Sequence, residues 1–230
     1  MLQITNFSNN ILTNINFHLQ EGENLIILGS NGAGKSTLAK ALCGILDSDS
    51  IELFQNKLHL LNAKNRAKLI NYIPPKLEIF DEYISLKEYL ELSKIYSEFS
   101  VDDILKLLNL DNLKDKACSK LSSGEQQLTM IASSLLHNAK LTIFDEPTAN
   151  LDPQKTLKIS KILASDKIQN RIIITHDLNL AYKLGYKVLY ILDGEVEFFD
   201  SNEKFFETSN LDKLFGSSLK RIENYFVVNL

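Results

Sequence analysis

The chain has 230 residues, of which 44% are hydrophobic and 23% are charged, a composition typical of a soluble globular protein with one sizeable core. Its formal net charge of −4 argues against a basic surface for nucleic acid, so we expect no nucleic-acid partner. No run approaches the roughly 18 apolar residues of a membrane span, and the first residues lack the pattern of a secretion signal.

Four short apolar runs predict buried strands, at residues 25–28, 141–144, 171–175 and 187–192. Continuous apolar runs of this length are typical of strands covered on both faces, as in a parallel sheet. Helical patterns lie between these runs. They occupy residues 36–44, 122–137 and 153–164. The alternation of strand and helix predicts an α/β core.

Residues 76–120 differ in character from the rest. The segments SLKEYLELSKIY and VDDILKLLNL carry apolar residues at helical spacing, and Ser100 with Asp103 fits a capping arrangement before the second helix. We therefore expect a small helical subdomain, residues 76–120, inserted in a core made of residues 1–75 and 121–230. Further on, DGEVEFFDS predicts a turn and a strand, and YFVVN predicts a last strand.

The segment LIILGSNGAGKSTLAKAL places a glycine-rich loop between a predicted strand and a predicted helix. Glycines let the backbone wrap closely round phosphates, so that N–H groups and the helix N-terminus face the negative charge. We expect Lys35 to reach the β- and γ-phosphates and the Ser36 hydroxyl to ligate Mg²⁺. A glycine-rich turn with a chance lysine is the alternative interpretation. The predicted phosphate-contacting residues are Gly29, Ser30, Asn31, Gly32, Ala33, Gly34, Lys35, Ser36 and Thr37.

Two acidic residues follow the run at residues 141–144. In LTIFDEP, Asp145 could hold Mg²⁺ through its water shell, and Glu146 could polarise an attacking water. Alone, the pair would be two solvated carboxylates in a turn, but a phosphate loop in the same chain makes that interpretation weaker. His176 ends another predicted strand and could donate a hydrogen bond to the γ-phosphate. We therefore expect Glu146, His176 and Lys35 to be catalytic, and Ser36 and Asp145 to be metal ligands.

The segment LSSGEQQLTMIASSLL begins with serine and glycine at a predicted helix N-terminus. This end is a second anion-binding position, yet one chain has only one phosphate loop to supply the anion. Taken alone, the segment predicts a helix cap.

The phosphate loop, LSSGEQQ, LTIFDEPTANLD and ITHDLNLAYKLG, in this order, resemble the nucleotide-binding subunit of an ATP-binding-cassette (ABC) transporter over nearly the whole chain. The resemblance implies a P-loop NTPase core, with a mixed and mainly parallel sheet, flanking helices, an N-terminal antiparallel β part and the inserted helical subdomain. It implies an ATPase that uses ATP and Mg²⁺ to drive membrane transport.

The same resemblance implies a head-to-tail homodimer, in which the LSSGEQQ helix of one subunit completes the ATP site of the other. Asp152 would lie in the loop that crosses the dimer interface, and Asp152 followed by Pro153 also fits an N-cap and first helical position. The implied nucleotide contacts are Ser122, Ser123, Gly124 and Asp152, with Ser123 standing where the family usually has a glycine.

Two outlying segments resemble ATPases of importers for iron–siderophore, haem and cobalamin. They are LLNAKNRAKLINYIP and the tail from THDLNLAYKLG to KRIENYF. This resemblance implies import of a metal chelate, with polytopic permease subunits, a periplasmic or extracellular binding protein, and a peripheral position on the cytoplasmic face of the membrane. The alternatives are an exporter or lipoprotein-release ATPase, because TANLD is common there, a soluble non-transport ABC protein, or a nucleotide-binding regulator.

The chain departs from the family at Pro75. The family places a Gln there, after a tyrosine-hydrophobic-proline run, where it contacts Mg²⁺ and the attacking water. Pro75 has no side-chain donor or acceptor and no backbone N–H. We expect ATP binding to survive, because Mg²⁺ tolerates water in place of one protein ligand, and turnover or coupling to be reduced. Water, or Glu78 from the following turn, would take the position of the Gln.

A second departure concerns the base. The family usually stacks adenine on an aromatic residue shortly after the first strand, and this chain has no tyrosine before Tyr72. Phe7 is the nearest candidate, and packing of Phe7 in the core is the alternative.

Overall fold

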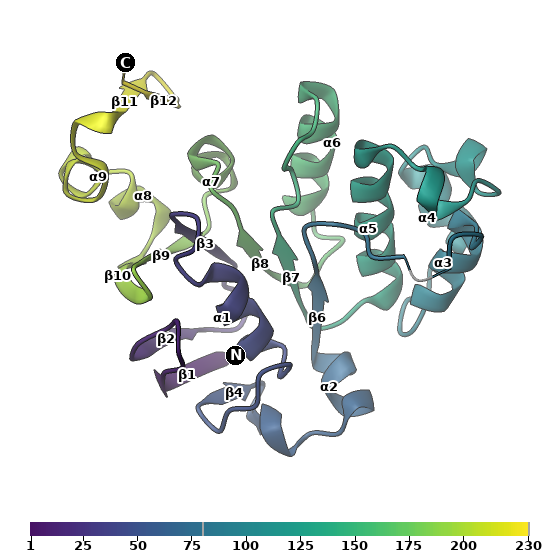
Figure 1. The fold of residues 1–230 in the computed structure, drawn as a ribbon, viewed down its shortest axis with the longest axis horizontal. Coiled ribbons are helices and arrows are strands. Elements are labelled where there is room, and N and C mark those ends of the chain that lie inside the picture. The colour runs from purple at the N-terminus through teal and green to yellow at the C-terminus, as the bar shows by residue number, and fades with distance from the viewer. Residues whose placement is uncertain (80, 230) are drawn as a thin grey trace. The chain divides into compact units, whose positions relative to one another are not determined.

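The computed structural model describes residues 1–79 and 81–229 of the chain, and Figure 1 shows the helices and strands. The chain forms two compact units: Met1–His59 together with Ile172–Leu230, and Leu60–Arg171. The helical subdomain predicted at residues 76–120 falls inside the second unit, and its boundaries remain a prediction. Across the two described stretches, no helix combines the length and the apolar character needed to cross a bilayer.

An antiparallel sheet opens the first unit. Its strands run in the order β2 (Ile15–Leu19), β1 (Leu2–Phe7), β4 (Ile51–Leu53) and β5 (Asn56–Lys57). β2 alternates buried and exposed residues along its length, as expected when one face of a sheet packs on a core and the other faces solvent. An N-terminal antiparallel part was expected, and this sheet confirms it.

A second set of strands in the first unit leads into the phosphate loop. β3 (Leu25–Gly29) pairs in parallel with β8 (Asn170–Ile174) and with β9 (Lys187–Leu192), and β10 (Glu195–Asp200) runs antiparallel to β9. The first four residues of β3 are all buried, because a strand with neighbours on both edges and cover on both faces has no solvent side. Three of the four apolar runs predicted as strands are confirmed here as β3, β8 and β9, and the fourth is confirmed in the second unit as β7 (Leu141–Asp145).

Helix α1 (Lys35–Leu42) follows β3 through the phosphate loop (Figure 1). The other elements of the first unit are α7 (Leu178–Leu184), α8 (Asn202–Phe205), α9 (Thr208–Phe215), a 3₁₀ turn (Gly216–Ser218) and a hairpin of β11 (Leu219–Ile222) and β12 (Tyr225–Val228). A further 3₁₀ turn spans Leu58–Leu60.

The second unit is built on the long helix α5 (Ser123–His137) and two parallel strands, β6 (Ile70–Ile73) and β7 (Leu141–Asp145). α3 (Leu86–Ser93) and α4 (Val101–Leu107) pack against α5 (Figure 1). The remaining elements are α2 (Ala63–Leu69), α6 (Pro153–Leu163) and the 3₁₀ turns Asp111–Leu113 and Cys118–Lys120.

Side-chain caps fix where these helices begin. The hydroxyl of Ser100 accepts from the backbone N–H of Asp103, and the Asp103 carboxylate accepts from the backbone N–H of Ser100, which confirms the predicted capping box. Asp152 caps α6 with Pro153 in its first turn, as predicted. Such caps satisfy N–H groups that have no partner inside the helix.

Candidate functional site

The phosphate loop needs glycine at two positions because of close backbone contacts. A Cβ on Gly29 would lie 2.3 Å from the carbonyl oxygen of Ile191, and a Cβ on Gly34 would lie 2.5 Å from Cδ2 of Leu12. Gly34 also has φ of 99°, a left-handed conformation that residues with a side chain rarely adopt. A side chain at either position would therefore collide with the strand or the turn behind the loop.

The start of α1, at the end of this loop, has no side-chain cap. Gly34 is the N-cap residue and contributes no side-chain hydrogen bond, so the first N–H groups of the helix have no cap of the kind seen at α4. The ammonium of Lys35, 8% exposed, donates to the carbonyl oxygens of Gly29 (2.9 Å) and Ser30 (2.8 Å). Ser36, next in the helix, is exposed. Positive charge and N–H donors thus gather at one helix N-terminus, as an anion requires.

Hydrogen bonds hold the residues on both sides of His176 in the first unit. The backbone N–H of Thr175 donates to Ile27 of β3 (3.1 Å), and the carboxylate of Asp177 caps α7 by accepting from the N–H groups of Asn179 and Leu180. His176 itself is exposed. Its backbone is therefore held while its ring faces solvent.

In the second unit, Asp145 is the last residue of β7 and is 2% exposed. Its Oδ2 accepts a hydrogen bond of 2.8 Å from the hydroxyl of Tyr72. Glu146 follows with φ of 50°, a conformation that costs a residue with a side chain on the order of 1 kcal/mol or more. At the end of β7, the Asp145 carboxylate is thus buried, and the backbone at Glu146 turns away from the strand direction.

The start of α5 is capped by its own residues. The Ser122 hydroxyl accepts from the backbone N–H of Glu125, and the Glu125 carboxylate accepts from the backbone N–H of Ser122 (2.8 Å) and from Lys116 Nζ (2.9 Å). The Ser122 N–H, and with it the Lys116 ammonium, holds the pKa of the Glu125 carboxyl below its usual value. Ser123 is exposed beside this cap.

Lys155 of α6 connects the start of α5 with Asp152. Its side chain lies over Gly124, where a Cβ would be 2.3 Å from Cδ and 2.7 Å from Nζ. The same ammonium pairs with Asp152 Oδ2 at 3.1 Å. Gly124 and Asp152, both implied as nucleotide contacts by the same resemblance, thus share one contacting side chain in the second unit.

Three contacts were not predicted from the sequence: those of Tyr72, Lys155 and Gln127. The Gln127 side-chain amide donates to the carbonyl oxygen of Pro75 (2.9 Å), and Gln127 is only 6% exposed. A polar residue on the buried side of a helical pattern signals a hydrogen-bond partner, so Gln127 could have been noticed. Tyr72 and Lys155 gave no comparable signal. Phe7 is 4% exposed, which supports core packing over adenine stacking.

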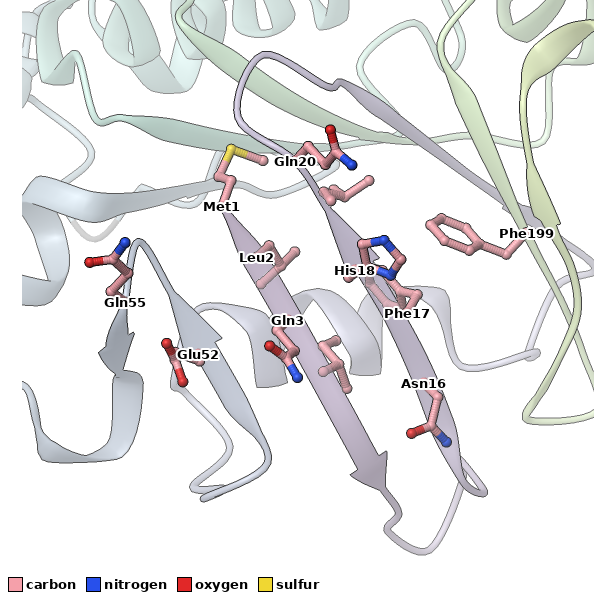
Figure 2. A pocket seen from close by; sticks show the side chains of 12 residues that line it. Met1, Leu2, Gln3, Asn16, Phe17, His18, Gln20, Glu52, Gln55 and Phe199 are labelled. Carbon is pink, nitrogen blue, oxygen red and sulfur yellow. The ribbon is translucent and has the colours of Figure 1, made fainter.

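A separate hollow of about 640 Å³ lies on the outer face of the antiparallel sheet (Figure 2). Phe17 and His18 turn toward Phe199 there, with ring centroids 5.6 and 6.5 Å from that of Phe199. The residues that line this hollow include none of the predicted nucleotide contacts.

The family model described as ABC transporter matches residues 12–149, more than half of the chain. The chain belongs to this family. ABC ATPases bind ATP with Mg²⁺ and hydrolyse it to drive transport, which confirms the expected ATPase activity and cofactors.

Two relatives match over most of this chain and over most of their own length. An uncharacterized ABC transporter ATP-binding protein of Methanocaldococcus jannaschii is 33% identical over 223 residues, which cover 91% of this chain and 87% of the relative. The arginine transport ATP-binding protein ArtP of Haemophilus influenzae is 30% identical over 207 residues, covering 82% and 85%. Other matched relatives are much longer, and this chain spans only 36% to 44% of their length.

Solved structures share the fold. A transporter described as of metal-chelate type, in an inward-facing conformation, has a chain with a TM-score of 0.76 at 23% identity, covering 98% of this chain and 94% of that one. CbiO1 of Clostridium perfringens, part of the ABC transporter complex cbiONQ, has a TM-score of 0.77 at 26% identity and covers 92% of each chain. A dimeric ATP-binding cassette bound to ADP and phosphate has a TM-score of 0.76 at 24% identity, covering 88% and 99%. The expected P-loop ABC ATPase fold is confirmed.

Proposed function

We propose that the chain is the ATP-hydrolysing subunit of an importer for a metal chelate of the iron–siderophore, haem or cobalamin type. The observation that carries the ATP-binding part is the N-terminus of α1, which has no side-chain cap, with Lys35 beside it and a loop that admits only glycine at two positions. The import class rests on the resemblance of LLNAKNRAKLINYIP and of the tail to ATPases of such importers. The metal-chelate type transporter among the solved structures supports the same class.

The triphosphate is proposed to bind along residues 29–37. In the loop, the Lys35 ammonium faces two neutral carbonyl oxygens, of Gly29 and Ser30. A γ-phosphate would offer charged acceptors instead, so both partners of the hydrogen bond would be ionised and their Coulomb attraction would add to it. Lys35 would therefore turn from the loop carbonyls to the phosphate when ATP binds.

The chain also has residues that fit a magnesium ion. The Ser36 hydroxyl and the Asp145 carboxylate are the hard oxygen donors that Mg²⁺ prefers, and we assign both to it. When bound, Mg²⁺ would neutralise charge that develops on the transferred phosphoryl group. Glu146 would accept a proton from the attacking water, and His176 would donate a hydrogen bond to the γ-phosphate.

Residues at the start of α5 and before α6 are proposed to contact ATP bound by a second copy of the chain. They are Ser122, Ser123, Gly124 and Asp152. α5 runs for 15 residues, so its N-terminus carries the positive end of a full helix dipole. The related cassette that forms a dimer with ADP and phosphate supports a homodimer as the working form.

The region round α3 and α4 exposes large apolar side chains. Tyr83 is 88% exposed, Leu92 75% and Phe99 52%, and large exposed apolar side chains are what an interaction surface requires. We propose that this region meets a polytopic permease, which would place the chain on the cytoplasmic face of the inner membrane as a peripheral subunit. A periplasmic or extracellular binding protein would act through the permease.

The arginine transport relative favours a second candidate, an importer of a small polar nutrient such as an amino acid. The two candidates share the ATPase and differ in the permease. Membrane vesicles that carry the chain with its co-purified permease would separate them. Stimulation of ATP hydrolysis by ferric siderophore, haem or cobalamin supports the first candidate, and stimulation by arginine alone supports the second.

The ATPase proposal itself is tested with Glu146→Gln, which keeps the size of the side chain but removes the base. This variant should bind ATP, hydrolyse it at least about 100-fold more slowly, and form a dimer that sizing chromatography detects only when ATP is present. Lys35→Ala serves as the control, because it should lose ATP binding and remain monomeric. A Glu146→Gln variant that stays monomeric in saturating ATP would contradict the proposal.

A further inference from the structure

We propose that Tyr72 is a positioning residue for Asp145, an inference that rests on the ATPase function proposed above. The hydroxyl of Tyr72 donates a hydrogen bond of 2.8 Å to Oδ2 of Asp145. The two residues lie 73 positions apart in the sequence and in neighbouring strands of the second unit. The bond therefore exists only because β6 and β7 pair.

The register of that pairing explains why tyrosine reaches the carboxylate. Tyr72 lies opposite Ile143 in the parallel pair, and Asp145 lies two residues further along β7. Side chains two residues apart leave a strand on the same face, about 7 Å from each other along the strand. A tyrosine side chain that leans along the strand spans this distance. Phenylalanine would cover the same surface and leave the carboxylate without this donor.

Burial of Asp145 increases the effect of the Tyr72 hydrogen bond on the carboxylate. Asp145 is 2% exposed, so water competes weakly for its oxygens, and a buried charge depends on the hydrogen bonds that it receives. A hydroxyl bound to a carboxylate is among the stronger hydrogen bonds. Because the bond holds Oδ2, it fixes the rotation of the whole carboxylate and so the direction of Oδ1. The Asp145 carboxylate would then be held in one orientation for the metal, whether it binds the ion directly or through a water.

Pro75 increases the importance of this orientation in the present chain. Position 75 supplies no side-chain oxygen or nitrogen, so one protein ligand of the family is absent here. With fewer protein groups to place the metal, more of its placement falls on Asp145 and on the residue that orients it. Tyr72 is the residue that orients Asp145, and it lies in β6, the strand that leads to Pro75.

The test measures metal binding without turnover. Free Mn²⁺, used as a substitute for Mg²⁺, is titrated by electron paramagnetic resonance into the whole protein with a non-hydrolysable ATP analogue. Tyr72→Phe should weaken Mn²⁺ binding about tenfold, as expected for the loss of a hydrogen bond to a metal-binding group. Binding of the analogue without metal should not change. Tyr89→Phe is the matched control, because Tyr89 is in the same unit and its hydroxyl bonds to Ser133, so its Mn²⁺ affinity should equal that of the wild type.

Asp145→Asn completes the design. If Tyr72 acts through Asp145, the double variant should bind Mn²⁺ no more weakly than Asp145→Asn alone, since coupled residues are not additive. Equal Mn²⁺ affinity of Tyr72→Phe and wild type would overturn the inference, and so would an equal loss of affinity for the metal-free analogue. A wild type that binds no Mn²⁺ with the analogue would instead overturn the proposed function.

Discussion

The side-chain amide of Gln127 donates a hydrogen bond of 2.9 Å to the backbone carbonyl oxygen of Pro75. Gln127 belongs to α5, the helix that begins with the proposed nucleotide contacts, and Pro75 follows β6. Proline has lost its N–H but keeps its carbonyl, so this contact uses the one backbone group that the residue still offers. We expect glutamine at position 75 to keep this contact, because it uses only the backbone carbonyl.

Restoring the glutamine should therefore add a side chain without disturbing this contact. We predict that Pro75→Gln raises ATP turnover, or its stimulation by the permease, by about threefold, which corresponds to less than 1 kcal/mol of barrier. The gain would come from a side-chain oxygen near the metal and from a less rigid backbone after Pro74. The measurement is steady-state phosphate release with and without the co-purified permease.

Pro74→Ala is the control for backbone rigidity, because it removes the neighbouring proline ring without adding a polar group. If Pro74→Ala gives the same increase, flexibility alone explains it. No change in either variant would mean that Pro75 is a neutral substitution in a site whose catalysis depends on Glu146 and His176.

A methyl group at Gly124 offers a test of the proposed dimer contact. The three atoms nearest to the Cβ of Gly124→Ala would belong to the flexible end of Lys155, which can move, so the free energy of unfolding should change by less than about 1 kcal/mol. Close approach of a phosphate to the backbone would be blocked, because only glycine leaves that space. We expect ATP-dependent dimerisation in the Glu146→Gln background to weaken at least about tenfold, measured by sedimentation.

Lys155→Ala separates the two possible causes of that loss. Combined with Gly124→Ala, it removes the displaced ammonium while keeping the methyl group. Continued loss of dimer in the combined variant would identify the blocked approach as the cause. Full recovery would show that Lys155, pushed away from Asp152, had caused the defect.

The elements of this fold could be predicted where a local pattern specifies them. β3 and β7 are continuous apolar runs, α4 begins at a serine with an acid three residues on, and Asp152 with Pro153 opens α6. The glycine-rich phosphate loop could be predicted equally well, because Gly29 and Gly34 satisfy steric and conformational constraints of the backbone itself.

Contacts that join distant segments could not be predicted in the same way. The Tyr72–Asp145 bond depends on which strands are neighbours and in what register, and Lys155 reaches Gly124 only because α5 and α6 lie side by side. Strand order and helix packing follow from the burial of the whole core, so no short window of sequence contains them. The polar positions they create look like ordinary surface residues in the sequence.

The charge of Glu125 should stabilise the fold while opposing the bound phosphate. The pKa of this carboxyl is lowered in the folded chain, first by the Ser122 N–H and then by Lys116. Its contribution is therefore present above the pKa of the unfolded chain, about 4.3, and is lost as pH falls through the lower folded value. Glu125→Gln should reduce the free energy of unfolding by about 1 kcal/mol at pH 7, and the difference should shrink as pH falls from 5 to 3.

The same variant should strengthen ATP-dependent dimerisation, since it removes a negative charge from the helix end assigned to a phosphate. Chemical denaturation at several pH values and sizing chromatography at pH 7 measure the two effects. If the loss of stability of Glu125→Gln relative to wild type were larger at pH 3 than at pH 7, the ion-pair explanation would be contradicted. Lys116→Met should reproduce the loss of stability.

We predict that Ile11, rather than Phe7, contacts the nucleotide base. Ile11 is 52% exposed, and its Cγ2 lies 3.2 Å from the Cβ position of Gly34 in the phosphate loop. The Asn9 side chain accepts from the backbone N–H groups of Ile11 and Leu12, both at 2.8 Å, which fixes this turn. The turn therefore presents an apolar side chain beside the loop, in a chain that lacks the family's aromatic residue.

We predict that Ile11→Tyr raises the affinity for ATP about tenfold, the gain expected from stacking one base on an aromatic ring. Phe7→Leu should lower the free energy of unfolding by about 1 kcal/mol, because it changes a buried side chain, and should leave the affinity of the folded protein unchanged. Fluorescence titration with labelled ATP and GTP measures both. A Phe7→Leu variant that loses affinity for ATP while keeping its stability would indicate that Phe7 contacts the base. An unchanged affinity of Ile11→Tyr would show that the base does not lie beside residue 11.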